Sequence, residues 1–84
     1  MKATVDFLND KKVFTALLSN GVSLSHDDPI ALAQLLLDAG VTPGAAKWRI
    51  WTLENKFEDI MSAVLQKDTL MARMACHELL VRIS

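Results

Sequence analysis

The stretch from residue 42 to residue 67 reads TPGAAKWRIWTLENKFEDIMSAVLQK and contains no glycine or proline after its first three residues. Thr42 can cap a helix, and Pro43 suits the first helical position. Apolar residues then recur every three or four positions, namely at Ala46, Ile50, Leu53, Phe57, Ile60 and Val64. This heptad-like spacing predicts one helix over residues 43–66, about 35 Å long. A break at Glu54–Asn55 is also compatible with the pattern.

The segment before this stretch has clear signals for the start and the end of a helix. Asp28 is a natural cap, Pro29 follows it, and Gly40 is a natural stop. These signals predict a helix over residues 29–39. Apolar residues cover most of its circumference, so this helix should be buried in the middle of the fold.

The N-terminal region also has helical spacing. Residues 5–19 place three large apolar side chains on one face, and Asn20–Gly21 can supply a left-handed stop. Strand signals are nearly absent, because the alternating residues 22–25 are too few to build a sheet. The apolar side chains of this predicted helix are Phe7, Phe14 and Leu18.

A fourth helix is predicted at the C-terminal end, over residues 68–83, with Asp68 as its cap. One of its stripes consists of Leu70, Met74, His77 and Val81. The sequence thus predicts an all-α protein, with four helices in a compact bundle or an orthogonal array. No linker or repeat divides the chain, so residues 1–84 are expected to form a single helical domain.

Composition restricts the functional classes. The chain has 84 residues, a hydrophobic fraction of 51% and a formal net charge of −1. It is therefore not a disordered tail, and it lacks the basic excess of a general nucleic-acid coat. A domain of this size has a thin core, so we expect it to share apolar surface with a partner, including a second copy in a homodimer.

The sequence predicts a cytoplasmic location. A single cysteine, Cys76, cannot form an internal disulfide, which fits a reducing compartment. The longest uninterrupted apolar run is Leu35–Leu37, far shorter than a membrane span. We therefore expect no membrane association.

Two tryptophans are candidate contact residues. On the predicted helix, Trp48 points about 200° and Trp51 about 140° away from the apolar stripe. Another element of the fold can cover this side; alternatively the indoles anchor a protein partner, or they stack on a base. The candidate protein-binding residues are Trp48, Trp51, Asn55 and Lys47.

The junction between the second and third predicted helices reads GVTPGA at residues 40–45. It resembles the turn of the helix-turn-helix in phage-repressor-like regulators. That resemblance implies DNA binding by Thr42, Lys47 and Arg49. Leu36 departs from the pattern, because a small residue is expected four positions before the turn glycine.

The remaining polar groups give no pattern for catalysis, and we predict no enzyme, no cofactor and no metal site. The run His26-Asp27-Asp28 contains one imidazole and also makes a good helix cap. Cys76 and His77 are neighbours on a predicted helix, where adjacent side chains point about 100° apart. The acidic residues Glu54, Glu58 and Asp59 are typical of a solvated helix face.

The sequence therefore favours a small non-catalytic protein-binding module. Its size resembles that of inhibitors and adaptors from phages and mobile elements, which occupy a surface of a larger host complex. The alternative is a small transcriptional regulator that uses the turn at Gly40–Val41 to bind DNA.

Overall fold

The computed structural model describes residues 1–48 and 56–83, and in these residues the chain is a mixed α/β protein. The prediction of an all-α bundle is wrong. Three strands come first: β1 (Ala3–Leu8), β2 (Val13–Leu18) and β3 (Ser23–His26). They are followed by α1 (Pro29–Asp38), the 3₁₀ turn η1 (Pro43–Ala45), β4 (Ala46–Trp48), α2 (Lys56–Leu65) and α3 (Thr69–Ile83).

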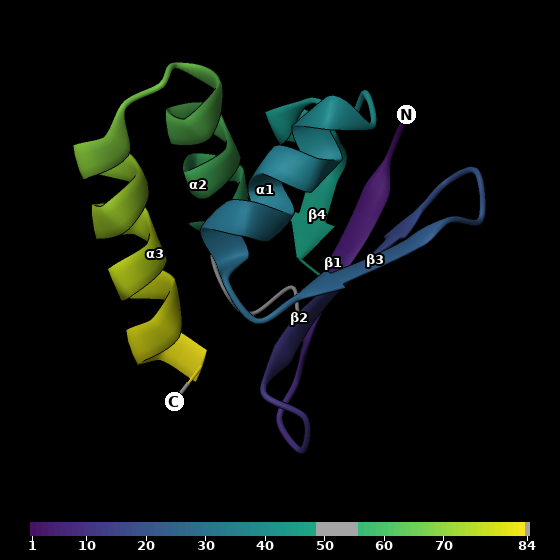
Figure 1. The fold of residues 1–84 in the computed structure, drawn as a ribbon, viewed down its shortest axis with the longest axis horizontal. Coiled ribbons are helices and arrows are strands. Elements are labelled where there is room, and N and C mark those ends of the chain that lie inside the picture. Colours follow the sequence, from purple (N-terminus) through teal and green to yellow (C-terminus); the bar gives the residue numbers. More distant parts are fainter. Residues whose placement is uncertain (49–55, 84) are drawn as a thin grey trace.

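The four strands form one sheet in the order β3-β2-β1-β4. β1, β2 and β3 are antiparallel neighbours, whereas β4 lies parallel to β1. Figure 1 shows α1 and α2 on one side of this sheet, with α3 beyond α2 at the outer margin of the molecule. The helices therefore cover one face of the sheet, and no element within residues 1–48 and 56–83 covers the other, which we call the open face.

The predicted helix over residues 5–19 is wrong because these residues form a hairpin. β1 alternates between buried Ala3 and Val5 and an exposed Thr4, as a half-buried strand does. The turn at residues 9–12 holds Lys12 at a φ of 55°, and the Lys12 N–H donates to the Leu8 carbonyl at 2.8 Å. This turn changes the phase of the alternation, so that in β2 the inward residues are even-numbered: Phe14, Ala16 and Leu18.

Asn20–Gly21 connects β2 to β3 instead of ending a helix. Gly21 has a φ of 90°, in the left-handed region that glycine tolerates best. The Leu18 N–H donates to the Val22 carbonyl at 2.9 Å, and the Val22 N–H donates to Asn20 Oδ1 at 3.0 Å. Asn-Gly between apolar runs is a strong hairpin signal, because a tight hairpin turn requires positive φ angles that these residues tolerate.

The predicted helix over residues 29–39 is confirmed in α1. The Ile30 N–H donates to Asp28 Oδ1 at 2.9 Å, and Pro29 occupies the first turn. Gly40, at a φ of 95°, ends the helix, and the Val41 N–H donates back to the Leu36 carbonyl at 2.9 Å. The predicted C-terminal helix is also present, as α3, with Asp68 Oδ1 accepting from the Met71 N–H at 3.0 Å.

The continuous helix predicted over residues 43–66 is wrong. Its first residues form the turn η1 and the strand β4, and among its described residues those at 56–65 are α-helical, as α2. The break considered at Glu54–Asn55 lies outside the described residues.

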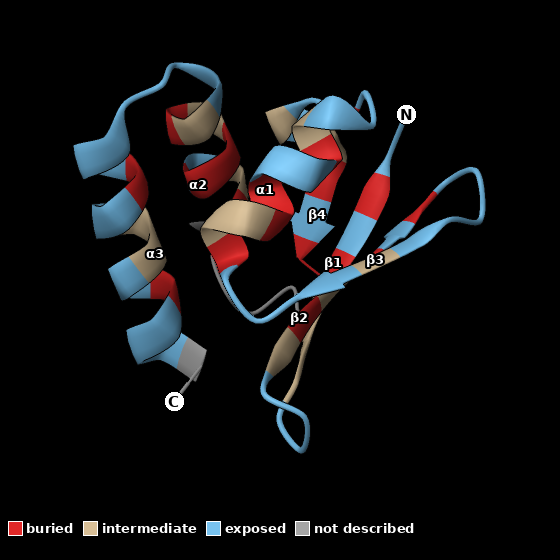
Figure 2. Cartoon of the chain, in the orientation of Figure 1, coloured by how far each residue is buried: buried red, intermediate tan, exposed pale blue. Residues whose placement is uncertain are grey.

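The core lies between the covered face of the sheet and the helices. Three aromatic rings run through it: Phe14 packs edge-on against Trp48 with ring centroids 6.2 Å apart, and Trp48 lies 6.4 Å from Phe57. Leu32 and Leu36 of α1 are fully buried in the same cluster. Figure 2 shows the buried sides of the helices turned toward one another and toward the sheet.

Candidate functional site

The open face of the sheet presents side chains in regular cross-strand rows. The first row runs Ser23–Leu17–Thr4–Lys47 across the four strands. The second row is Ser25–Thr15–Asp6, and the third is Val13–Leu8. These residues alternate with the core residues along each strand, so all of them project away from the helices.

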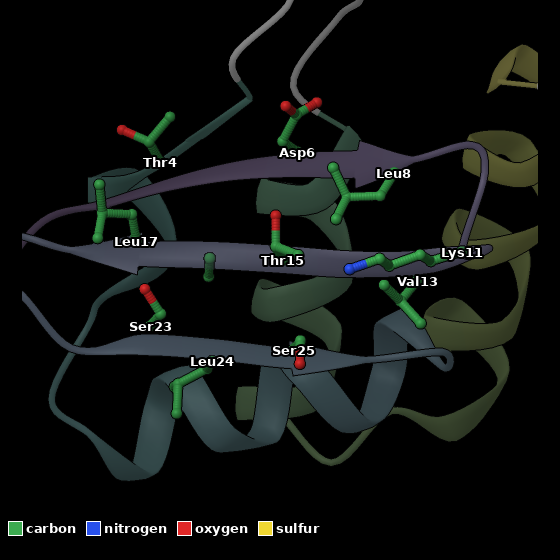
Figure 3. A pocket seen from close by; sticks show the side chains of 11 residues that line it. Thr4, Asp6, Leu8, Lys11, Val13, Thr15, Leu17, Ser23, Leu24 and Ser25 are labelled. Carbon is green, nitrogen blue, oxygen red and sulfur yellow. The ribbon is translucent and has the colours of Figure 1, made fainter.

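A hollow of about 560 Å³ lies on this face. Figure 3 shows it across β1, β2 and β3, with Thr15 near its centre and the helices behind the sheet. Lys11 extends from the β1–β2 turn back over the end of β2 (Figure 3). Hydroxyl groups, aliphatic side chains and the Asp6 carboxylate therefore form the surface, and the Lys11 ammonium group lies at one end.

The open face carries the charged side chains of Asp6 and Lys11 and is bordered by Lys47, and its apolar side chains are partly exposed. Leu17 is 57% exposed although it lies in the middle of a row, and Leu8 and Val13 are half-buried. Asp6 accepts a hydrogen bond from the Phe7 N–H at 2.8 Å. Exposed aliphatic groups among polar side chains give this face the mixed composition that protein–protein interfaces share with the rest of a protein surface.

The predicted site residues do not come together on one helix face. Lys47 lies on β4 opposite Thr4, so it borders the open face, although as part of a strand. Trp51, Asn55 and Arg49 lie outside the described residues. The outward-facing residues of β1 and β2 are not among the predicted site residues. The alternation of apolar and polar residues in Ala3–Leu8 is the sequence signal that could identify them.

Trp48 is a core residue in this structure. Only 8% of its surface is exposed, which fits the alternative that another element of the fold covers this residue. Its indole Nε1 is buried and has no hydrogen-bond partner among the described residues. Its side chain packs against Phe14 and Phe57, which makes it a structural anchor between the sheet and α2.

The structural premise of the DNA-binding alternative is also wrong. A helix-turn-helix needs a second helix after Gly40–Val41, but residues 43–45 form a 3₁₀ turn and residues 46–48 a strand. Thr42 precedes this turn without a side-chain capping bond. On the described part of the open face no aromatic ring is present for stacking on bases, because Phe7, Phe14 and Trp48 lie on the covered side.

The His26-Asp27-Asp28 run lies at the start of α1. His26 Nδ1 accepts the Asp28 N–H at 2.9 Å and also lies 2.9 Å from Asp27 Oδ1. A nitrogen that accepts a hydrogen bond has no proton to donate, so Nδ1 cannot make both contacts as hydrogen bonds at the same time. Among the described residues, no three His, Cys, Asp or Glu side chains form a group that could hold a metal ion.

Cys76 and His77 point in different directions on α3. Cys76 is half-buried toward the core, whereas His77 is exposed. Burial, and to a lesser extent the negative charge of Asp28, raise the pKa of the Cys76 thiol. A thiol with a raised pKa is a poor nucleophile at neutral pH.

The outer face of α3 is a second exposed surface. Leu70 is 68% exposed, Val81 59% and Met74 53%. The opposite side of the same helix buries Ala72 and Leu79 against the rest of the protein. α3 is thus apolar on two sides but covered on only one, which is unusual for a helix of a small monomeric domain.

None of the described helices is long and apolar enough to cross a lipid bilayer. Comparison of the chain with protein-family models, with curated proteins and with solved structures finds no match.

Proposed function

We propose that this protein is a small non-catalytic protein-binding module whose contact surface is the open face of the sheet. One observation carries the proposal: a hollow of about 560 Å³ spans three strands on a sheet face that no described element covers. An antiparallel sheet can leave one face in water, but such a face normally carries polar residues at most positions. Here Leu8, Val13 and Leu17 interrupt the hydroxyl groups.

The chemistry of this surface favours contact over catalysis. Its hydroxyl groups lie on three different strands of a shallow surface, and Asp6 is bonded to its own strand through the Phe7 N–H. A nucleophile needs an adjacent base oriented by a third group. Thr4, Thr15 and the serines of β3 are instead spaced to form hydrogen bonds with an opposing protein surface.

The proposal includes the class of protein expected from chain length. A single domain of 9.3 kDa can act by occupying a surface of a larger complex, as small inhibitors and adaptors of phages and mobile elements do. One cysteine, half-buried and with a raised pKa, is compatible with action in the reducing cytoplasm.

The proposal is tested by affinity purification from nuclease-treated extract of the native host. The wild-type chain is compared with Leu17→Lys, which places a charge in the longest row of the open face. Leu65→Lys is the matched control, because Leu65 lies on α2 and is 59% exposed, almost the same as the 57% of Leu17. We expect a protein partner that the wild type and Leu65→Lys retain and Leu17→Lys loses. Equal retention by all three chains, or retention of duplex DNA alone, would contradict the proposal.

A further inference from the structure

We propose that the outer face of α3 binds the same face of a second copy of this chain, as a parallel helix pair related by a two-fold axis. This inference goes beyond the sheet-face proposal and does not rest on it, because the two surfaces share no residue. Figures 1 and 2 show α3 at the margin of the molecule with its outward side exposed. Two copies can therefore approach through α3 while both sheets remain open.

Four of the exposed residues of α3 form a narrow stripe with the spacing of a coiled coil, and exposed Met71 and Leu80 lie beside it. Leu70, Met74, His77 and Val81 are separated by four, three and four residues, which is the alternation of d and a positions. At 100° per residue they lie within about 60° of one another around the helix. Residues Ala72 and Leu79, on the opposite side, are the ones that fix α3 to the rest of the protein.

A second copy matches this stripe residue by residue. In a parallel pair, each of the three apolar side chains meets its own counterpart near the axis. His77 meets His77 of the second copy, where one neutral imidazole can donate a hydrogen bond and the other can accept it. The polar residue in the stripe therefore has a partner that a purely apolar groove would not supply.

Charge complementarity selects the second copy and its orientation. Arg73 lies on one flank of the stripe and Glu78 on the other, five residues apart, in the g and e positions of the heptad. Opposite flanks meet in a parallel pair, so Arg73 of each copy faces Glu78 of the other copy. In an antiparallel pair like flanks meet, and Arg73 would face Arg73. Arg73 has no ion-pair partner within the part of the chain that the structure describes.

The length of α3 determines how strong this dimer should be. Its 15 residues give about 22 Å of helix, or two heptads. This contact is smaller than a standard interface of about 800 Å² per partner. We therefore expect a reversible dimer whose population depends on concentration.

Sedimentation equilibrium tests the inference. The apparent mass of the wild-type protein should rise with concentration from 9.3 kDa to twice that value. Met74→Lys should raise the dissociation constant at least tenfold, because Met74 is 53% exposed in the protomer and lies in the stripe. Leu65→Lys, on α2, should leave the dissociation constant unchanged. A wild-type chain that stays monomeric at millimolar concentration would overturn the inference, as would a dimer that survives Met74→Lys.

Orientation is tested with an introduced cysteine in a Cys76→Ala background. Leu70→Cys should form a disulfide-linked dimer on mild oxidation, because the two copies of residue 70 meet in a parallel pair. In an antiparallel pair residue 70 would face residue 81, and the two cysteines would lie about 16 Å apart along the helix. Oxidation that leaves Leu70→Cys unlinked but links a mixture of Leu70→Cys and Val81→Cys would overturn the parallel arrangement.

A charge exchange tests the flanks. Arg73→Glu should weaken the dimer several-fold, and the double variant Arg73→Glu/Glu78→Arg should restore it. Failure of the double variant to recover affinity would contradict the proposed pairing. A monomeric chain that still binds its partner through the open face would overturn the α3 inference and leave the proposed function standing.

Discussion

Trp48 lies opposite Val5 in the parallel register between β4 and β1. It is one of three residue pairs that join β4 to the N-terminal hairpin, and both side chains are buried. The indole then fills the space between Phe14 of β2 and Phe57 of α2. The stability of the fold should therefore depend strongly on Trp48.

Trp48→Ala should destabilise the protein by about 3–5 kcal/mol, the usual cost of removing a buried tryptophan. Trp48→Phe should cost less, because it retains a ring and removes a buried indole N–H that has no partner in the described part of the chain. Lys47→Ala, at the adjacent exposed position, is the control and should change the free energy of unfolding by less than about 0.5 kcal/mol. Urea denaturation measures all three, and an unfolding midpoint for Trp48→Ala close to that of Lys47→Ala would show that the indole is not in the core.

Gly21→Ala should destabilise the β2–β3 turn by about 1–2 kcal/mol, because an L-residue is strained at positive φ. The added Cβ would meet nothing within 4 Å, so the cost comes from the backbone alone. Gly44→Ala is the matched control: its Cβ would lie 3.7 Å from Glu58 Oε1, an ordinary contact. Thermal unfolding should separate the two variants; equal melting temperatures would argue against a left-handed turn at Gly21.

Residues with local signals were predicted correctly, and residues that depend on distant neighbours were not. Asp28, Gly40 and Asp68 act within one turn of their own helices, so α1 and α3 could be found from the sequence. The hairpin was missed because its turn shifts the phase of the alternation. Phe7 and Phe14 lie seven residues apart, which also fits a helix, although they pair across two strands with ring centroids 4.7 Å apart.

The parallel pairing of β4 with β1 has no local signal. Ala46–Trp48 is a strand of 3 residues, and it forms because β1, more than forty positions earlier in the chain, supplies its hydrogen-bond partners. Apolar spacing across this segment therefore suggested a helix that the structure does not contain. Lys47 was expected at a binding surface, and it borders the open face, but the reasoning that placed it on a helix was wrong.

Cys76 should react slowly with alkylating reagents in the native state. Its pKa is raised above 9.0, first by burial and then by the charge of Asp28. Asp28→Asn should speed the reaction, because asparagine still caps α1 but carries no charge. Iodoacetamide kinetics measure this effect, and unchanged rates in Asp28→Asn would exclude an influence of the Asp28 charge.

The same shift fixes the sign of the pH dependence. The folded state favours the neutral thiol. Cys76 therefore contributes to the free energy of unfolding below the unfolded pKa, and this contribution is lost as pH rises through 9.0 and above. The free energy of unfolding should fall more steeply above this pH in the wild type than in Cys76→Ala. If the free energy of unfolding depends on pH in the same way in both proteins, the assignment of this effect to Cys76 is contradicted.

If the open face of the sheet binds a protein, the dissociation constant of the purified partner depends on the residues of this face. Thr15→Lys and Leu17→Lys each place a charge on this face, and Leu65→Lys places the same charge on α2. Calorimetric titration should give at least a tenfold weaker complex for both sheet variants and less than a twofold change for Leu65→Lys. Unchanged affinity in both sheet variants, with the fold intact by circular dichroism, would show that the partner binds elsewhere on the molecule.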